Sequence, residues 1–175
     1  TTLTDRERIA GLGDAVPPPL SKAIIAAIST VWTWRSPTSL EICAGTGGLA
    51  EGASAAGLEH VGLIERSSTC CVLLRNSRAW APDAVVEEDV EAHDFGQCAH
   101  RVGLLSGGPP CQPWSISGLH KGQMDERDLL GQLPDLVTTI QPEAFLFENV
   151  PGLLSTVNRP YLNDVIARLR APGDG

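Results

Sequence analysis

Short apolar runs alternate with longer helix-like segments along most of this chain, and this alternation restricts the possible folds more than any other feature. Strands are predicted at residues 39–43, 61–65, 84–89, 102–106 and 144–148. Helices are predicted between and after them, at residues 48–56, 68–79, 125–140 and 160–170. Strands that alternate with helices form a parallel sheet with crossover helices. The predicted fold is therefore α/β, a doubly wound three-layer sandwich.

Three consecutive prolines, residues 17–19, lie ahead of the first predicted strand, and we expect a helix directly after these prolines. Its apolar residues recur at steps of three and four: Leu20, Ala23, Ile24, Ala27, Ile28 and Val31. This spacing places one apolar stripe on one face of the helix, which we expect to pack on the rest of the molecule. We therefore divide the chain into an N-terminal segment, residues 1–35, and a main domain, residues 36–175.

The composition favours a single soluble domain. Of 175 residues, 42% are hydrophobic and 19% are charged, and the longest early stretch without charge, between Lys22 and Arg35, is too short to span a bilayer. The five cysteines and four histidines lack the spacing of a disulfide framework or a metal site. We expect free thiols, a cytoplasmic location, no membrane segment and no metal.

The charge balance argues against a domain that holds nucleic acid unaided. Thirteen basic against 21 acidic residues give a net charge of −8, whereas a domain that grips phosphates usually has a basic face. If a nucleic acid is the substrate, another surface has to help hold it.

The residues after the first three strands are typical of a nucleoside site. Ligands of doubly wound sheets bind beyond the carboxyl ends of the strands, where the strand order reverses. The segment Glu41–Gly48 is a glycine-rich turn that lets backbone approach a ligand. Glu65 can accept the hydroxyls of a ribose, and Asp89 can take the exocyclic amine of an adenine. The alternative for each acid is a solvated strand end.

The fourth strand leads into Ser106-Gly-Gly-Pro-Pro-Cys-Gln-Pro-Trp-Ser115. Two glycines permit a sharp exit from the strand, and three prolines fix the backbone around Cys111. A thiol held at this edge of the sheet indicates a nucleophile. The alternative is a small apolar residue in a turn.

Glu148 and Asn149 end the fifth strand and should converge with Cys111. This combination suits attack on an unreactive pyrimidine ring. A carboxyl that protonates or hydrogen-bonds N3 of cytosine makes C6 accept a thiolate, and the C5 carbon then becomes able to take a methyl group.

The Gly-Gly-Pro-Pro-Cys-Gln-Pro-Trp-Ser and Glu-Asn-Val segments, with Ala-Gly-Thr-Gly-Gly upstream, closely resemble the DNA (cytosine-5)-methyltransferases over nearly the whole chain. The resemblance implies a Rossmann-like methyltransferase fold, S-adenosylmethionine as cofactor, double-stranded DNA as substrate and a role in restriction-modification. By the same resemblance Cys111 is the nucleophile that bonds covalently to C6, Glu148 is the N3 partner, and Asn149 fixes neighbouring loops.

The same resemblance assigns two further groups of residues. The family's cofactor positions are matched by Cys43, Ala44, Gly45, Gly48, Glu65, Arg66, Asp89, Val90, Pro110 and Leu130. Asp14 lies at a further cofactor position, where it replaces the family's usual Asn. DNA contacts are implied for Gln112, Trp114, Ser115, Ser117 and Gln123. Residues 116–123 match a loop that closes over a flipped-out base. For Trp114 and Ser115, a hydrophobic plug and a turn hydroxyl are the alternatives.

Two departures from the family pattern lead to hypotheses. Gly13-Asp-Ala-Val-Pro-Pro18 resembles a segment that the family usually places near its C-terminus, so we expect a circular permutation in which residues 1–35 pack on the cofactor site of the catalytic domain, residues 36–175. The family's Gln-x-Arg-x-Arg strand and target-recognition domain have no match here. We therefore expect the catalytic part of a split or truncated enzyme, completed by a second polypeptide that carries both.

Three other functions remain open at this point. An RNA cytosine-5 methyltransferase would act on a cytosine that needs no flipping. A non-catalytic regulatory subunit would bind cofactor or partner only. A nucleotide-binding oxidoreductase is disfavoured because the turn lacks the third spaced glycine of the dinucleotide fingerprint.

Overall fold

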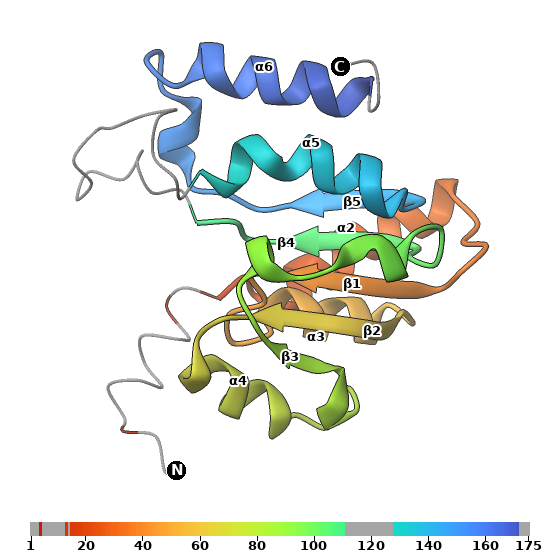
Figure 1. The fold of residues 1–175 in the computed structure, drawn as a ribbon. Helices are drawn as coiled ribbons and strands as arrows, with labels where there is room; N and C mark the ends of the chain where they lie inside the picture. The colour runs from red at the N-terminus through yellow and green to blue at the C-terminus, as the bar shows by residue number, and fades with distance from the viewer. Residues whose placement is uncertain (1–3, 5–12, 14, 111–127, 172–175) are drawn as a thin grey trace.

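The computed structural model describes residues 4, 13, 15–110 and 128–171. Within them, a parallel sheet of five strands has the order β3-β2-β1-β4-β5 (Figure 1). The strands are β1 (Thr38–Ile42), β2 (Glu59–Glu65), β3 (Val85–Glu87), β4 (Leu104–Gly107) and β5 (Ala144–Phe147). All five predicted strands are confirmed, with ends shifted by at most two residues. The order reverses between β1 and β4, which places the predicted ligand edge between these strands.

The described helices flank this sheet. The α-helices are α2 (Pro18–Val31), α3 (Gly48–Ala55), α4 (Ser68–Arg75), α5 (Leu129–Ile140) and α6 (Arg159–Arg170). Short 3₁₀ turns are η1 (Pro82–Ala84), η2 (Val90–Ala92), η3 (Phe95–Cys98) and η5 (Pro151–Leu154). No helix in the described part of the chain is long and apolar enough to cross a membrane.

Two boundaries of the helices predicted after the first strand differ from the prediction by more than one residue. Helix α4 ends at Arg75 rather than at residue 79, because Ser77 N–H and Trp80 Nε1–H both donate to the Leu74 carbonyl, at 3.1 and 3.0 Å, and turn the chain away. Helix α5 begins after Asp128, whose carboxylate accepts a hydrogen bond from Gly131 N (3.3 Å). Residues 125–127, predicted to start this helix, lie outside the described residues.

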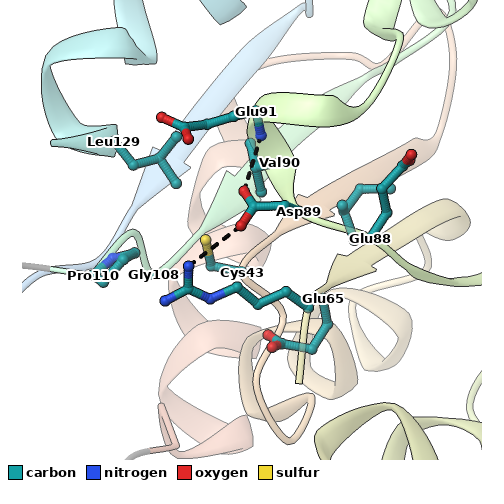
Figure 2. Close-up of a pocket in the computed structure, with 11 residues that line it drawn as sticks. Cys43, Glu65, Glu88, Asp89, Val90, Glu91, Gly108, Pro110 and Leu129 are labelled. Carbon is teal, nitrogen blue, oxygen red and sulfur yellow. Dashed lines mark hydrogen bonds and ion pairs between the residues drawn. The ribbon is translucent and has the colours of Figure 1, made fainter. Parts of the chain in front are cut away.

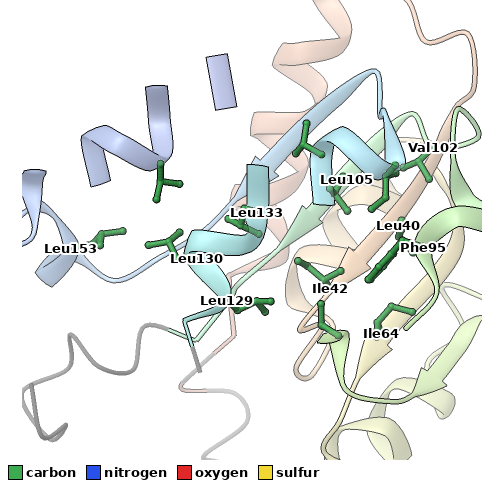
Figure 3. Packing of buried hydrophobic residues seen from close by; sticks show 14 of the residues in the cluster. Leu40, Ile42, Ile64, Phe95, Val102, Leu105, Leu129, Leu130, Leu133 and Leu153 are labelled. Atoms are coloured by element: carbon green, nitrogen blue, oxygen red, sulfur yellow. The ribbon is translucent and has the colours of Figure 1, made fainter. Parts of the chain in front are cut away.

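The sheet is covered on both faces, as a three-layer sandwich requires. On one face, Leu40, Ile42, Ile64 and Leu105 pack with residues of α5 and α6 and with Phe95 (Figure 3). On the other face, Leu104 packs with residues of α2 and α3, and Leu63 packs with residues of α3 and α4. The doubly wound α/β prediction is therefore confirmed.

Helix α2 does not use the apolar stripe that its spacing predicted. Its buried residues are Ser21 and Ile25, whereas Leu20 and Val31 of the stripe are 53% and 84% exposed. The prediction was wrong because close approach to α3, rather than apolar area, determines which face of α2 is buried.

Two glycines of α3 make that close approach possible. A Cβ at Gly52 would lie 1.7 Å from Ser21 Oγ, and a Cβ at Gly48 would lie 2.2 Å from the Val16 carbonyl oxygen. Ser21 Oγ donates to the Gly48 carbonyl at 3.3 Å. The N-terminal segment is thereby held against the glycine-rich turn.

Glu143 ties the connection between α2 and β1 to the start of β5. Its buried carboxylate accepts hydrogen bonds from Arg35 N (3.0 Å), Ser36 N (2.8 Å) and Trp32 Nε1 (3.2 Å). Burial alone would raise the pKa of Glu143, but these donors outweigh it and lower that pKa. This link anchors the end of α2 that is remote from the glycine-rich turn.

Candidate cofactor and catalytic site

Two cavities open at the carboxyl ends of the strands. The β2–β3 cavity, about 250 Å³, is lined by Cys43, Ile64, Glu65, Arg66, Glu88, Asp89, Val90, Glu91, Gly108, Pro110 and Leu129 (Figure 2). The glycine-turn cavity, about 270 Å³, is lined by Ala15, Val16, Glu41, Cys43, Ala44, Gly45, Thr46, Gly48, Leu49, Glu65, Cys70, Gly108 and Glu148. Because Cys43, Glu65 and Gly108 border both cavities, the cavities are two halves of one candidate site.

The glycine-rich turn between β1 and α3 separates the two halves. Gly45 and Gly47 have φ angles of 56° and 88°, and Cys43 has a φ of 50°, which is uncommon for a residue with a side chain. Ala44 N donates to the Ile64 carbonyl at 3.2 Å and keeps the turn beside β2. The glycines of the turn therefore bring main-chain atoms to the cavity wall.

Glu65 ends β2 with a carboxylate that is held on both oxygens. Oε2 accepts a hydrogen bond from Gly45 N (2.8 Å), and Oε1 accepts one from Ser67 N (2.7 Å). A carboxylate oxygen can accept two hydrogen bonds, so each oxygen keeps one free acceptor position. Glu65 is thus a fixed acceptor that can still receive two ligand hydroxyls.

Asp89 and Arg66 both line the β2–β3 cavity and form an ion pair with each other. Arg66 Nη1 donates to Asp89 Oδ2 at 3.3 Å, and Glu91 N donates to Asp89 Oδ1 at 3.1 Å. Val90 and Leu129 add apolar surface to the same cavity. An apolar wall with polar groups at its edge suits a planar heterocycle that carries an amine.

Among the described cysteines, Cys43 is the one that borders both cavities. Burial, together with the nearby Glu65 carboxylate, raises the pKa of Cys43 to about 12. A thiol with such a pKa stays protonated at neutral pH and is a poor nucleophile. Cys43 is therefore a wall residue and does not compete with Cys111.

Glu41 forms the deepest acidic group of the glycine-turn cavity. It is 1% exposed, and burial raises its pKa to about 8, against smaller opposing effects of the Ala50 amide and the Ser106 hydroxyl. Its carboxyl is therefore largely neutral at pH 7. Sequence reasoning missed this residue, although an acid inside an otherwise apolar strand was the available signal.

Glu148 and Asn149 follow β5 at the same edge of the sheet. Glu148 N donates to the Gly107 carbonyl (2.9 Å), and a Cβ on Gly108 would lie 3.4 Å from Glu148 Oε2. Asn149 Nδ2 donates to the Pro109 carbonyl (3.1 Å), and its Oδ1 accepts a hydrogen bond from Val150 N (2.9 Å). Both residues therefore lie beside the backbone that leads towards Cys111.

The predicted cofactor residues separate into three groups. Those on the two cavity walls are Cys43, Ala44, Gly45, Gly48, Glu65, Arg66, Asp89, Val90 and Pro110. Leu130 packs in the core instead, and its neighbour Leu129 lines the β2–β3 cavity. Asp14 lies outside the described part of the chain, as do the predicted nucleophile Cys111 and the predicted DNA contacts Gln112, Trp114, Ser115, Ser117 and Gln123.

Several wall residues were not predicted from the sequence. Ala15 and Val16 come from the N-terminal segment, and Cys70 comes from the first turn of α4. The Gly13–Pro18 motif was the sequence signal for Ala15 and Val16. No local pattern distinguishes Cys70, because only tertiary packing brings α4 to the glycine-rich turn. Among the described residues, no group of three or more His, Cys, Asp or Glu side chains could hold a metal ion.

A parallel sheet that reverses between β1 and β4, with acids after β2 and β3 around a glycine-rich turn, defines an α/β domain of the S-adenosylmethionine-dependent methyltransferase type. The family model described as C-5 cytosine-specific DNA methylase matches residues 38–173. The chain belongs to this family. The match begins after the N-terminal segment, so the circular permutation stays a prediction.

Curated relatives agree with this assignment. Type II methyltransferase M.NgoMIV of Neisseria gonorrhoeae is 43% identical over 129 residues, which cover 73% of this chain and 40% of the relative. M.PspPI of Psychrobacter sp. is 41% identical over 121 residues, 68% of this chain and 28% of the relative. M.Eco47II of Escherichia coli is 42% identical over 120 residues, 67% of this chain and 28% of the relative. The chain thus spans between 28% and 40% of the length of these three relatives.

Proposed function

We propose that this chain is the cofactor-binding and catalytic part of a DNA cytosine-5 methyltransferase, which transfers a methyl group from S-adenosylmethionine to C5 of cytosine. One observation carries the proposal. Pro110, which directly precedes Cys111, and Glu148 border a two-part cavity whose remaining walls fit a nucleoside cofactor. Family membership supports the same reaction.

The described residues fit S-adenosylmethionine. Glu65 has free acceptor positions for the ribose hydroxyls, and Asp89 is available to the adenine amine beside the apolar surfaces of Val90 and Leu129. The glycine-turn cavity is then left for the amino-acid end of the cofactor. When bound, S-adenosylmethionine supplies an electrophilic methyl group.

The chain's own residues activate the cytosine. Glu148 hydrogen-bonds or protonates N3, which makes C6 electron-poor, and the Cys111 thiolate forms a bond to C6. The C5 carbon becomes nucleophilic and accepts the methyl group. Loss of the C5 proton to a base then expels the Cys111 thiolate and restores the aromatic ring.

Asn149 positions this machinery without touching the reacting atoms. Its side chain hydrogen-bonds the Pro109 carbonyl and the Val150 amide, which belong to two different loops. The contact ties the loop that bears Cys111 to the loop that bears Glu148. We expect substitution of Asn149 to slow catalysis through a change in this geometry.

A partner polypeptide is part of the proposal, and the charge balance supports it. The chain carries a net charge of −8, and DNA repels an acidic surface unless basic groups offset that charge. A basic polypeptide with a target-recognition domain would hold the DNA against this site. Rapid methylation of one defined DNA sequence by the chain alone would contradict the need for such a partner.

The substrate class is tested by transfer of labelled methyl from S-adenosylmethionine to mixed-sequence DNA and, in parallel, to tRNA. With the purified chain alone, we expect slow, sequence-indifferent labelling of cytosine C5 in DNA. Faster labelling of tRNA would favour an RNA methyltransferase instead. Binding of S-adenosylmethionine with no transfer to either substrate would favour a non-catalytic subunit.

A further inference from the structure

Tyr161 of α6 and Asp128, which directly precedes α5, form a hydrogen-bonded pair across 33 residues of sequence. The Tyr161 hydroxyl donates to Asp128 Oδ1 at 2.5 Å and is also within hydrogen-bond reach of Asp128 Oδ2. Tyr161 is 7% exposed and belongs to the apolar core that α5 and α6 share (Figure 1). A hydroxyl that donates to a carboxylate makes one of the stronger hydrogen bonds in proteins.

The same carboxylate caps α5. Asp128 Oδ1 accepts a hydrogen bond from Gly131 N at 3.3 Å, so this side chain connects the start of α5 both to its own first turn and to α6. A Cβ at Gly131 would lie 2.7 Å from Asp128 Oδ2 and 3.0 Å from the Tyr161 hydroxyl oxygen, so glycine leaves room for the pair. Arg168 Nη1 of α6 donates to the Gly131 carbonyl at 3.0 Å. Helix α6 therefore holds the first turn of α5 at two points.

The first turn of α5 is also where this helix meets the β2–β3 cavity. Leu129, the first helical residue, lines that cavity (Figure 2), whereas Asp128 and Tyr161 are not among the described residues that line it. One step along a helix turns a side chain by about 100°. A small rotation of this turn therefore changes the wall that Leu129 presents to a ligand.

We propose that Tyr161 is a positioning residue for cofactor binding, which acts through Asp128 to hold Leu129 against the adenine of S-adenosylmethionine. This inference rests on the proposed function, because it takes S-adenosylmethionine as the ligand. Tyr161 itself touches neither the cofactor nor the reacting atoms. Without the Tyr161 hydroxyl, the Asp128 carboxylate loses its link to α6, and the first turn of α5 rotates more freely at the cavity wall.

Titration calorimetry of the whole chain measures this effect as a loss of affinity. The probes are S-adenosylmethionine and 5′-methylthioadenosine, which has the nucleoside but lacks the amino acid. Tyr161→Phe removes one hydroxyl and keeps the ring in the core. We expect it to weaken binding of both probes by the same factor of about 5, because a wall of the nucleoside site is loosened. A loss confined to S-adenosylmethionine would contradict the inference.

Two variants of Asp128 separate positioning from helix capping. Asp128→Ser keeps an oxygen that can cap Gly131 N, but its shorter side chain draws back from Tyr161. Asp128→Asn keeps both the length and an acceptor for the Tyr161 hydroxyl. We expect serine to weaken binding as much as Tyr161→Phe does, and asparagine to bind within about twofold of the wild type. If the serine variant binds as the wild type does, the pair is a cap alone and the inference fails.

A double-mutant cycle with Leu129→Ala tests whether Tyr161 acts through that side chain. Leu129→Ala removes apolar surface from the cavity wall and should weaken binding of both probes about tenfold. In that background, Tyr161→Phe should have no further effect, because the side chain that it positions is gone. Full additivity of the two losses would show that Tyr161 does not act through Leu129, and would overturn the inference.

Val165→Ala is the matched control, because it removes core packing from α6 one turn beyond Tyr161. It should lower the urea midpoint more than Tyr161→Phe does, yet leave both affinities at the wild-type values. Equal losses of affinity in the two folded variants would mean that general destabilisation explains the effect, and the inference would fail. Should Tyr161→Phe fail to fold, Asp128→Ser carries the same test.

The outcomes separate the two proposals. If S-adenosylmethionine does not bind the wild type, the proposed function fails. If it binds the wild type and the folded Tyr161→Phe variant equally well, the role of Tyr161 is overturned and the proposed function stands.

Discussion

In the β2–β3 cavity, the carboxylates of Glu65 and Asp89 are bonded on both oxygens within the chain, whereas in the glycine-turn cavity the carboxyl of Glu41 keeps one oxygen unpartnered among the described residues. The first half of the site is thus preorganised before any ligand arrives. The second half keeps a buried carboxyl oxygen that the described residues leave without a hydrogen-bond partner. The difference shows that one site can combine a rigid half, the β2–β3 cavity, with a responsive half, the glycine-turn cavity, in which the Glu41 carboxyl is not fixed on both oxygens.

The cause of this difference lies in where each acid stands on its strand. Glu65 and Asp89 come at strand ends, where the amides of Ser67 and Glu91, two residues further on, turn back and donate to them. Glu41 lies inside β1, where the adjoining amides are committed to the sheet. An acid in that position has to find donors from another element or from a ligand.

The largest expected effect is a loss of methyl transfer that leaves cofactor binding in both halves of the site unchanged. Cys111→Ala removes the nucleophile and should lower methyl transfer by about 10³-fold or more, because the raised pKa of the Cys43 thiol keeps it protonated and unable to replace Cys111. Binding of S-adenosylmethionine, measured by calorimetry, should equal that of the wild type. Retained methyl transfer would remove Cys111 from its assigned role.

Glu65→Ala removes an acid of the preorganised half, the β2–β3 cavity. The change removes the acceptor of the Gly45 and Ser67 amides, so the glycine-rich turn loses its tie to β2. We expect affinity for S-adenosylmethionine to fall about 10- to 100-fold and the free energy of unfolding to fall by about 1–3 kcal/mol. Glu59→Ala, at the exposed start of the same strand, is the matched control and should change neither quantity.

In the ligand-free chain, Glu41 of the responsive half should make the free energy of unfolding depend on pH. Because the pKa of Glu41 is raised to about 8 in the folded chain, the folded state holds this proton more tightly than the unfolded state. The resulting stabilisation is complete at low pH and is lost as pH rises towards 8, by about 1.4 kcal/mol per pH unit at most. Urea unfolding between pH 5.5 and 8 measures it, and the Glu41→Gln variant should lack this slope.

The smallest expected effect concerns the exposed edge of the preorganised half. Asp89→Asn weakens the ion pair between Arg66 and residue 89. Because the side chains of Arg66 and Asp89 are 67% and 44% exposed, the urea midpoint should hardly move. Affinity for S-adenosylmethionine should fall about 2- to 5-fold, since an amide accepts the adenine amine less strongly than a carboxylate does. A loss as large as that of Glu65→Ala would contradict the ranking of the two acids.

Much of this architecture could be predicted from the sequence because it depends on local patterns. Apolar runs identified the five strands, and the acids after β2 and β3 were recognised because strand ends face the ligand edge. The buried face of α2 could not be predicted, because Ser21 is buried through close contact with Gly48 and Gly52 of another helix.

Single-residue choices in the site were harder to predict. Leu129 and Leu130 are equally apolar, and one step along a helix rotates a side chain by about 100°, so only packing decides which one lines the β2–β3 cavity. Glu41 was missed because its environment depends on β4 and α3 as much as on its own strand. Its buried position follows from the strand register, which the sequence pattern does not specify.

The most direct test of the catalytic account uses DNA in which 5-fluorocytosine replaces cytosine. After attack on C6 and methylation at C5, the fluorine cannot leave as a proton would, so the bond between enzyme and base persists. The account predicts an adduct that requires S-adenosylmethionine, maps to Cys111 by peptide mass spectrometry and is absent from Cys111→Ala. An adduct on a different residue, or none under conditions in which ordinary cytosine is methylated, would contradict it.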